Sequence, residues 1–578
     1  MRFPSSTLES TLFFFTGCSL LLLSVPEIHL SLLNPIDSAY LWERSSVLPA
    51  LLIAYGVALV VLSFWSGYLA SRGTGLVGEI VRHMSNAHAL IRDDLLPALR
   101  RPFEPRWAAG GLLLVLCLGI AVRGYFLAQP LRYDEAYTFL KFVNGHVLRL
   151  FDYPYPNNHV LHTIFVKFST MIWGSHPWSI RLPAFIAGIA SIPLMWCLSR
   201  TLLRERSGTF AAVAISVFPY LVLYSVLARG YSTVVFLTLA LIWVAARTAQ
   251  SPSIAASAIL SIIAAFGLLT IPSTAFAVAG VYLWYGCLLL INGNKVNRVI
   301  NHFAAPCAVM TAGFAAVLYT PVIFVSKGIG PLLDNDYVKA QPTAEFLSEI
   351  YPHAAATLAD FSRDIPGPIL ISFVALMVIG TYGAAKKCDW PVLLLLPAVF
   401  TASAILSFVK HAIPFPRTWI FLIPVAILLA NAGWVYCLEG LPGKIQRSMN
   451  RGTILAGGVY ALSLILSNAI AKYPDTGTFP EAPRIAGYLK ALMKEGDEVY
   501  ASVPADYPTY FYLWYNGLSD FRVKEDNDGD QTKYFIVQKG GYLEPNPIED
   551  RIEEPVEKLI DLSDAAVFRI KPAHDQSG

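Results

Sequence analysis

Residues 131–163 read LRYDEAYTFLKFVNGHVLRLFDYPYPNNHVLHT, and this polar stretch stands between long apolar segments. It carries the adjacent acids Asp134 and Glu135 and an Asn-Asn-His triplet that ends at His159, with tyrosines and prolines among them. Ionisable groups beside membrane spans are costly to place, so such a cluster indicates a functional site. The alternative is a wet interfacial loop whose tyrosines lie at the level of the lipid headgroups. The paired acids and the sequence that follows favour the functional site.

The composition is that of a membrane protein. Of the 578 residues, 55% are hydrophobic and only 14% are charged, whereas globular proteins carry about 25% charged residues. The net charge of +3 is too small to indicate a nucleic acid as a partner. The seven cysteines fall in apolar segments or in loops that we place in the cytoplasm, so no disulfide framework is expected. None of them has the spacing of a metal-thiolate site.

Apolar runs of about 17 to 25 residues can cross a bilayer as helices. About thirteen such runs predict a polytopic α-helical membrane protein: 10–25, 47–69, 107–127, 179–202, 208–227, 232–249, 254–270, 274–292, 299–325, 366–385, 390–409, 417–437 and 452–471. The first is predicted to be a retained helix rather than a signal peptide, because no clear cleavage site follows it and a second span does.

Five clusters of lysine and arginine set the predicted orientation. They lie within 71–106, 200–206, 295–298, 386–387 and 444–451, all on one side of the predicted spans. Because positively charged loops face the cytoplasm, the N-terminus is predicted inside. Residues 128–178, residues 326–365 and the C-terminal tail are then outside, and we expect a bacterial inner (plasma) membrane. Segments 159–173 and 76–99 are predicted to be surface helices, on the outer and inner faces respectively.

Three parts follow from this pattern. Residues 1–106 are predicted to hold two N-terminal spans and a cytoplasmic amphipathic segment, and residues 107–472 a transmembrane catalytic domain. Residues 473–578 contain no span; a helix at 483–494 and strands at 498–503, 534–538 and 565–570 predict a small extracytoplasmic α/β domain. The acidic run at 526–530 has no glutamate at the twelfth position of a calcium loop, so we interpret it as a turn.

Asp134 is the candidate base. It follows the third predicted span on a short loop, where a carboxylate can take a proton from a hydroxyl nucleophile. Its neighbour Glu135 can raise the pKa of Asp134 or share a cation with it. The alternative is that these acids cap a helix that begins near residue 136, and both roles are compatible.

Arginines at the outer ends of three different spans are the complement of this acid. Arg181, Arg229 and Arg417 could each be an interface anchor. Together they are more typical of a phosphate-binding arrangement, because guanidinium groups pair bidentately with phosphate oxygens. Since the sequence contains no nucleotide-binding loop, we expect the phosphate to belong to a lipid-linked donor.

Several segments resemble a known superfamily. They are RYDEAYTF (132–139), PNNHVLHT (156–163), WSIRLPAFIAGIASIPLMWCLSRTL (178–202), LYSVLARGYSTVVFL (223–237) and HAIPFPRTW (411–419). In this order they resemble the GT-C polytopic membrane glycosyltransferases: protein O-mannosyltransferases, aminoarabinose transferases and lipopolysaccharide-core transferases that use polyprenyl-phosphate sugars. The resemblance covers roughly residues 107–440 and, weakly, the tail, and it implies a GT-C-like fold.

The resemblance also implies roles for single residues. Asp134, with Glu135 beside it, would deprotonate the acceptor, and the sugar would transfer with inversion. The predicted donor-phosphate and substrate-binding residues are Asn158, His159, Arg181, Arg229, Tyr231, His411 and Arg417. Many relatives have an acid or amide shortly before the Arg-x-Tyr motif, where this chain has Val226 and Leu227. No obligatory cofactor is therefore expected, and the candidate ligands for a divalent cation are Glu135 and His159.

The predicted function is transfer of a hexose or pentose from a polyprenyl-phosphate donor to a hydroxyl or amine of a lipid, glycan or protein acceptor at the extracytoplasmic face. The alternative is a transporter or flippase of a lipid-linked or small solute. Such a protein would more often show inverted repeats or broken helices with polar residues at the midplane, and the sequence shows neither. A structural or assembly protein would leave the acids and arginines unexplained.

Overall fold

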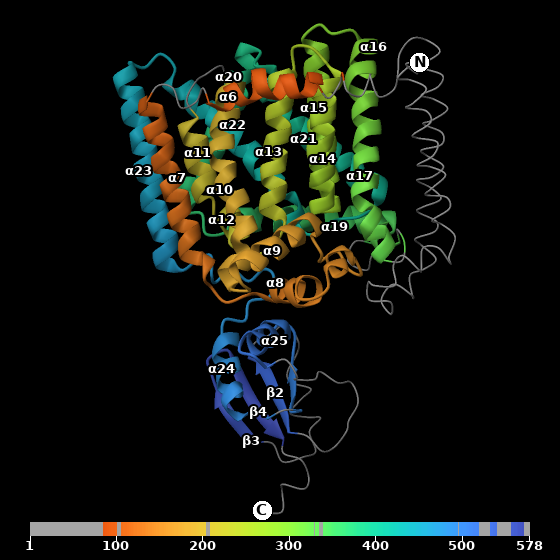
Figure 1. The fold of residues 1–578 in the computed structure, drawn as a ribbon. Helices are drawn as coiled ribbons and strands as arrows, with labels where there is room; N and C mark the ends of the chain where they lie inside the picture. The colour runs from red at the N-terminus through yellow and green to blue at the C-terminus, as the bar shows by residue number, and fades with distance from the viewer. Residues whose placement is uncertain are drawn as a thin grey trace, which may run out of the picture.

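The computed structural model describes residues 82, 85–100, 106–203, 208–326, 328, 330–333, 339–494, 496–518, 532–539 and 557–570. The predicted spans at 10–25 and 47–69 and the acidic run at 526–530 lie outside these residues. The described chain forms a large helical bundle, and a small domain with a β-sheet projects from one end of it (Figure 1). We call this end of the bundle the domain end.

Among the described residues, nine helical segments are long and apolar enough to cross a membrane. They are α7 (Arg106–Leu127), α10 (Pro177–Leu202), α13 (Tyr231–Thr248), η5 (Pro272–Thr274) with α15 (Ala275–Ile291), α16 (Val296–Val299) with η6 (Ile300–Ala304) and α17 (Ala305–Val325), α20 (Gly367–Lys387), α21 (Trp390–Lys410), η7 (Pro416–Phe421) with α22 (Leu422–Leu438), and α23 (Gly443–Ser467). Each overlaps one predicted span, so the predicted polytopic helical fold is confirmed.

The two other predicted spans that lie in the described chain differ from these nine. The run at 208–227 is divided into α11 (Thr209–Val217) and α12 (Pro219–Ser225), because Pro219 lacks the backbone N–H that would continue the helix. The run at 254–270 is α14 (Ile254–Thr270), which has 17 residues. Since α14 has the predicted bounds, ten of the thirteen predicted spans are found as single helical segments in the described chain, and nine of them have 18 residues or more.

The two ends of the bundle carry different surface helices. Residues 85–90, η1 (Ile91–Leu95) and α6 (Leu96–Arg100) are helical, and α6 lies across the end away from the small domain, against α10 (Figure 1). The domain end carries α8 (Tyr133–Thr138), η3 (Phe139–Val143), η4 (Val147–Phe151), α9 (Val160–Trp173), α18 (Gly330–Leu333) and α19 (Thr343–Ser362). The predicted surface helices at 76–99 and 159–173 thus correspond to helices at opposite ends of the bundle.

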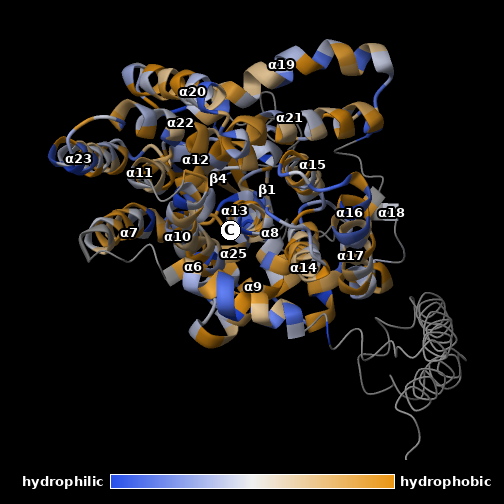
Figure 2. Cartoon of the chain, turned by 90° about the horizontal axis from the view of Figure 1, so that it is seen from above, coloured by the Kyte–Doolittle hydropathy of each residue, from blue (hydrophilic) through white to orange (hydrophobic). Residues whose placement is uncertain are grey.

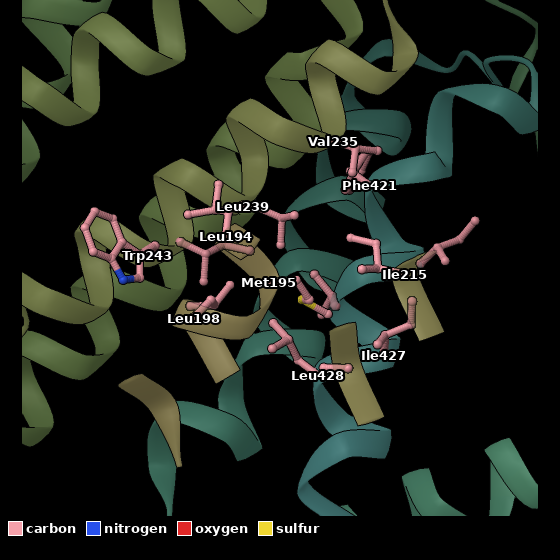
Figure 3. Packing of buried hydrophobic residues seen from close by; sticks show 14 of the residues in the cluster. Leu194, Met195, Leu198, Ile215, Val235, Leu239, Trp243, Phe421, Ile427 and Leu428 are labelled. Carbon is pink, nitrogen blue, oxygen red and sulfur yellow. The ribbon is translucent and has the colours of Figure 1, made fainter. Parts of the chain in front are cut away.

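Hydrophobic residues cover the periphery of the bundle as well as its interior (Figure 2). Leu113, Val309 and Val378 are exposed on α7, α17 and α20, as expected of surfaces in contact with lipid tails. Inside, Leu194, Met195 and Leu198 of α10 pack among side chains of α13 and α22 (Figure 3). Helices α20 and α22 pack closely against each other, since a Cβ on Gly433 would lie only 1.9 Å from the Leu376 carbonyl oxygen. Small residues at such crossings let membrane helices approach closely.

The small domain contains α24 (Ala482–Leu492), β1 (Glu498–Ala501), α25 (Asp506–Tyr515), β2 (Lys533–Gln538), β3 (Glu557–Asp561) and β4 (Ala565–Ile570). The strand order is β1-β2-β4-β3, with β1 parallel to β2 and β4 antiparallel to both of its neighbours. The predicted small α/β domain is confirmed. Sequence analysis missed β3, whose residues EKLID are largely exposed and carry no alternating apolar face.

Candidate active site

The two adjacent acids of α8 point to different surroundings. Asp134 lines a cavity at the domain end, and its side chain is 14% exposed. The Glu135 side chain is fully buried on the other side of the helix, where Oε2 accepts a hydrogen bond from the Arg132 N–H (3.0 Å). Neighbours in a helix differ by about 100° in direction, so one acid faces the cavity while the next helps to close the first turn of the helix.

Glu135 forms a bidentate ion pair with Arg181 of α10. Nε of Arg181 lies 2.8 Å from Oε1 and Nη2 lies 2.7 Å from Oε2, and neither side chain is exposed. The Ala228 N–H donates a further hydrogen bond to Oε1 (2.6 Å). Burial alone would raise the pKa of Glu135, but the Arg181 charge and these hydrogen bonds hold that pKa below its ordinary value. Glu135 is therefore an ionised residue that fixes α8 to α10 and to the α12–α13 turn.

The cavity that Asp134 lines has a volume of about 860 Å³. Four cations reach it from three regions of the chain: Lys141 follows α8, Arg229 lies in the α12–α13 turn, and Lys410 and Arg417 belong to α21 and η7. Among the described lining residues, Asp134 is the only acid. Such a cavity favours an anionic ligand and places one carboxylate beside it.

Aromatic and apolar side chains complete the cavity lining. The tyrosines are Tyr133, Tyr137, Tyr153, Tyr155, Tyr231 and Tyr507. Leu406 and Val409 of α21, with Ile271, Phe276 and Leu332, form an apolar part of the wall. Since α21 is a membrane-spanning helix whose Val409 is exposed, the cavity has an apolar side next to the region of lipid tails.

Arg229 is almost fully buried and is aimed by several acceptors. Its Nη1 donates to the Asn157 carbonyl oxygen (2.9 Å) and to Thr138 Oγ1 (3.2 Å), and its Nη2 lies 3.8 Å from Asp134 Oδ2. His159 stands against the same guanidinium, with Nε2 3.3 Å from Nη2. This arrangement places a fixed positive charge beside the candidate base.

Both ring nitrogens of His159 face donors. Nδ1 accepts a hydrogen bond from the Gly230 N–H (2.8 Å), and Nε2 lies 3.3 Å from Nη2 of Arg229. Burial and the nearby Arg229 charge hold the pKa of His159 well below its ordinary value, so the ring is neutral. Gly230 permits this contact, because a Cβ there would lie 2.7 Å from Thr270 Cγ2 and 3.2 Å from His159 Nδ1.

Arg417 is held by a residue from the linker between the bundle and the small domain. Asp475 Oδ1 accepts a hydrogen bond from Arg417 Nη1 (2.9 Å), and Oδ2 accepts one from the Tyr224 hydroxyl. The same linker runs beside the start of α8, where the Tyr133 N–H donates to the Gly477 carbonyl oxygen (2.8 Å). The linker thus contacts both Arg417 and the helix that carries Asp134.

Of the predicted site residues, Asp134, His159, Arg229, Tyr231 and Arg417 line the cavity. Four other predicted site residues do not line it: Glu135, Asn158, Arg181 and His411. Of these, Glu135 and Arg181 form the buried ion pair.

Asn158 and His411 have local structural roles. Asn158 Nδ2 donates to the carbonyl oxygens of Leu150 and Asp152 (3.0 and 2.7 Å), which shapes the loop before α9. His411 follows α21 in a left-handed conformation with its ring 5.5 Å from that of Phe346, and the preceding Lys410 lines the cavity instead.

The structure does not arrange the candidate metal ligands Glu135 and His159 to bind one metal ion. Both carboxylate oxygens of Glu135 are engaged by Arg181, and Nδ1 of His159 accepts from Gly230. In the part of the chain that the structure describes, no group of three or more His, Cys, Asp or Glu side chains is placed to hold a metal ion.

The sequence analysis did not identify several residues that line the cavity or hold its lining residues in place. Tyr133 and Tyr137 flank Asp134 at helical spacing and Lys141 lies one turn further on, so helical periodicity could have found them. Asp475 and Tyr507 lie more than 300 residues from α8 in the chain, and no local pattern marks them.

Comparison with known proteins addresses the fold and part of the sequence. Residues 158–324 match the family model described as dolichyl-phosphate-mannose-protein mannosyltransferase. No curated protein matches the chain in sequence.

Solved structures resemble a larger share of the chain. A crystal structure of ArnT from Cupriavidus metallidurans in the apo state has a TM-score of 0.53 and 14% identity, and the similarity covers 80% of this chain and 98% of that one. A structure of the same protein bound to undecaprenyl phosphate has a TM-score of 0.53 and 13% identity, with the same coverage. The arabinosyltransferase EmbB from Mycobacterium smegmatis is 16% identical over 56% of this chain and 30% of its own, with a TM-score of 0.38 that says nothing about the fold.

The ArnT similarity covers 80% of this chain, whereas the family match covers the segment from the polar loop to α17. The family match and the shared fold confirm the predicted resemblance: the chain has the fold of the GT-C superfamily of polytopic membrane glycosyltransferases.

Proposed function

We propose that this protein transfers a sugar from a polyprenyl-phosphate donor to an acceptor hydroxyl or amine, with Asp134 as the general base. The observation that carries the proposal is the cavity itself. It combines a single described acid, four cations and an apolar wall on a membrane-spanning helix. These are the features that a lipid-linked phosphate and a proton acceptor require in one place.

The donor phosphate belongs beside Arg229 and Arg417. Guanidinium groups stabilise phosphate oxygens by paired hydrogen bonds, and the charge on the leaving phosphate increases as the bond to the sugar breaks. Lys410 adds a positive charge at the same cavity. The prenyl chain would lie along Leu406 and Val409 of α21, where burial of each methylene group contributes about 0.8 kcal/mol.

The reaction step is a direct displacement. The acceptor oxygen or nitrogen attacks the anomeric carbon while Asp134 takes its proton. The bond from that carbon to the phosphate oxygen breaks, its electron pair stays on the lipid phosphate, and the configuration at the carbon inverts. Arg229, whose Nη2 lies 3.8 Å from Asp134 Oδ2, places a positive charge beside the carboxylate and the leaving phosphate.

The remaining predicted residues support this site rather than contact the substrate. Glu135 and Arg181 fix α8, and Asn158 shapes the loop that carries His159. His159 lines the cavity and stands against Arg229, which keeps that guanidinium in place beside the donor phosphate. The cation clusters of the sequence support an extracytoplasmic domain end in a bacterial inner membrane.

The solved ArnT structure bound to undecaprenyl phosphate supports the class of donor, since a protein of the same fold holds that lipid. A transporter of lipid-linked solutes would bind such a donor too, but it would not cleave the donor. Donor cleavage is therefore the property to measure.

The test uses the full chain in nanodiscs with a panel of undecaprenyl-phosphate sugars and, in parallel, nucleotide sugars, each supplied with a mixture of saccharide, lipid and peptide acceptors. Release of undecaprenyl phosphate is followed for the wild type, for Arg417→Ala, and for Arg484→Ala, a control arginine exposed on α24 of the small domain. We expect release from one lipid donor, a donor KM raised about tenfold or more in Arg417→Ala, and no change in the control. Binding without release, or turnover of nucleotide sugars, would contradict the proposal.

A further inference from the structure

One wall of the cavity is built of tyrosines from both parts of the molecule. Tyr133 and Tyr137 of α8 stack with ring centroids 6.2 Å apart and an interplanar angle of 23°. Tyr507 of α25 meets both rings, at 5.5 Å from Tyr133 and 4.7 Å from Tyr137. All three line the cavity. We call them the tyrosine wall.

The wall is held in place on each side. Lys141 Nζ lies 6.0 Å from the centroid of the Tyr507 ring, at the range of a cation–π contact. Behind it, Phe139 of η3 packs against Phe511 of α25 at 5.4 Å. Gly477 lets the linker pass next to α8, because its φ is +72° and a Cβ there would lie 2.6 Å from Tyr133 Cβ. The aromatic surface is therefore preorganised rather than assembled on binding.

Next to the wall is a carboxylate with unused hydrogen-bonding capacity. Asp506 precedes Tyr507 at the start of α25, and within the described chain its Oδ1 is buried without a hydrogen-bond partner. Burial raises the pKa of Asp506 to about 6. A buried polar atom left unpaired costs free energy, so this carboxylate destabilises the folded small domain when it is ionised.

The tyrosine wall and the phosphate-binding cations belong to different elements around the same cavity. The cations other than Lys141 come from the α12–α13 turn, α21 and η7, whereas the wall comes from α8 and α25. Asp134 adjoins both groups: it follows Tyr133 in the chain and lies 3.8 Å from Arg229. In an inverting displacement the acceptor and the leaving phosphate lie on opposite sides of the anomeric carbon. The cations serve the phosphate, so the wall serves the acceptor.

We infer that the tyrosine wall is the acceptor subsite and that the acceptor is a saccharide, bound with one face of its ring against the tyrosines. This inference rests on the proposed function. Aromatic rings present a flat apolar face to the C–H groups of a sugar, and phenolic hydroxyls at their edges can bond its hydroxyls. A sugar seated on Tyr133 and Tyr507 holds one hydroxyl next to Asp134.

The test compares three variants of the full chain: Tyr507→Ala, Tyr507→Phe and the control Tyr488→Ala, which removes an exposed tyrosine of α24 outside the cavity. Turnover is measured with mannobiose, maltose and arabinobiose as acceptors and with a serine-containing peptide as the alternative. We expect Tyr507→Ala to raise the saccharide KM roughly tenfold. Tyr507→Phe, which keeps the aromatic ring, should have a saccharide KM close to that of the wild type. The donor KM should stay unchanged in both variants. Equal saccharide KM values in Tyr507→Ala and Tyr488→Ala would overturn the inference.

A second measurement separates this inference from the proposed function. Binding of the same disaccharides, without donor, is followed by saturation-transfer NMR on wild type and Tyr507→Ala, with thermal melting as a check that both are folded. Saccharide binding that depends on Tyr507, without turnover of any donor, would keep the saccharide site and reject the transferase. Sugar transfer to the peptide, with no saccharide binding or transfer, would keep the transferase and reject the saccharide site.

Discussion

At the scale of single residues, the site depends on giving two adjacent acids different surroundings. Asp134 faces the cavity beside Arg229, whereas Glu135 is saturated by Arg181 and two backbone N–H groups. Proteins commonly assign different roles to neighbouring carboxylates in this way. Sequence analysis identified both acids but could not tell which one faces the substrate, because that depends on where α10 and the α12–α13 turn pack.

Removing the charge of Glu135 should destabilise the protein strongly. Glu135→Gln leaves Arg181 buried without its counter-charge, a loss that typically costs about 3–5 kcal/mol. Thermal unfolding in detergent should show a large fall in melting temperature for this variant and little change for Glu349→Gln, an exposed acid of α19. The double variant Glu135→Gln with Arg181→Met should lose less than the sum of the single variants. Additive losses would argue against the ion pair.

Asp506 predicts a pH-dependent stability difference. Its pKa rises from 3.8 to about 6 on folding, so its ionisation opposes folding above about pH 6 and has no effect below about pH 4. Asp506→Asn should therefore match the wild type at about pH 4 and become more stable than it as the pH rises to 6. The difference should reach at most about 3 kcal/mol, less what solvent screening removes. Melting curves with a constant offset across this range would show that Asp506 is not perturbed.

At the scale of elements, the linker between α23 and α24 is the key connection. Arg132 Nη1 donates to the carbonyl oxygens of Tyr473 (2.7 Å) and Asp475 (2.8 Å), and Nη2 donates to that of Ile470 (2.8 Å). The linker then pairs with the first residues of α8 and supplies Asp475 to Arg417. The small domain, the candidate base and a phosphate-binding arginine are thus fixed by one short segment.

Arg132→Lys should loosen this segment while keeping the charge, because an ammonium group cannot reproduce the planar fork of a guanidinium. We expect faster proteolytic cleavage between residues 468 and 481 and a lower transfer rate. Limited proteolysis followed by mass spectrometry measures the first effect, and Arg484→Lys on the surface of α24 is the control. Identical cleavage patterns in the two variants would show that Arg132 does not fix the linker.

Elements were predictable where one sequence signal decides them. The nine full-length spans each follow from an apolar run of sufficient length, and β1, β2 and β4 from short β-branched or aromatic stretches. The break at Pro219 could have been predicted from proline chemistry. The fixation of the linker could not, because Arg132 and Tyr473 are 341 residues apart and only the folded bundle brings them together.

At the scale of the whole molecule, the cavity lies where the bundle and the small domain meet. Residues from α8, α13, α21 and η7 contribute to it together with Tyr507 of α25. The overall class was predictable, since hydrophobicity sets the membrane fold and the change of composition after residue 472 marks the small domain. The cavity was predictable only in part: Asp134, Arg229 and Arg417 were identified, whereas Tyr507 and Asp475 come from segments without any recognisable motif.

The proposed orientation can be checked by cysteine labelling. In a chain whose native cysteines are replaced, Lys490→Cys on α24 and Lys295→Cys before α16 are both exposed positions at opposite ends of the molecule. In intact cells, or in spheroplasts where an outer membrane blocks the reagent, a membrane-impermeant maleimide should modify Lys490→Cys and spare Lys295→Cys until the membrane is permeabilised. The opposite pattern would place the domain end in the cytoplasm.

The central claim is that Asp134 is the base of a transferase that uses a lipid-phosphate donor. The most direct measurement is the single-turnover rate of undecaprenyl-phosphate release with donor and acceptor both saturating, for wild type, Asp134→Asn and Asp364→Asn. Asp364 is an exposed residue of the α19–α20 turn with φ of 62°, a conformation that asparagine also adopts readily. Loss of a general base should slow Asp134→Asn by roughly 10²- to 10⁴-fold, with donor binding retained and the control unchanged. Equal rates in Asp134→Asn and wild type would contradict the account.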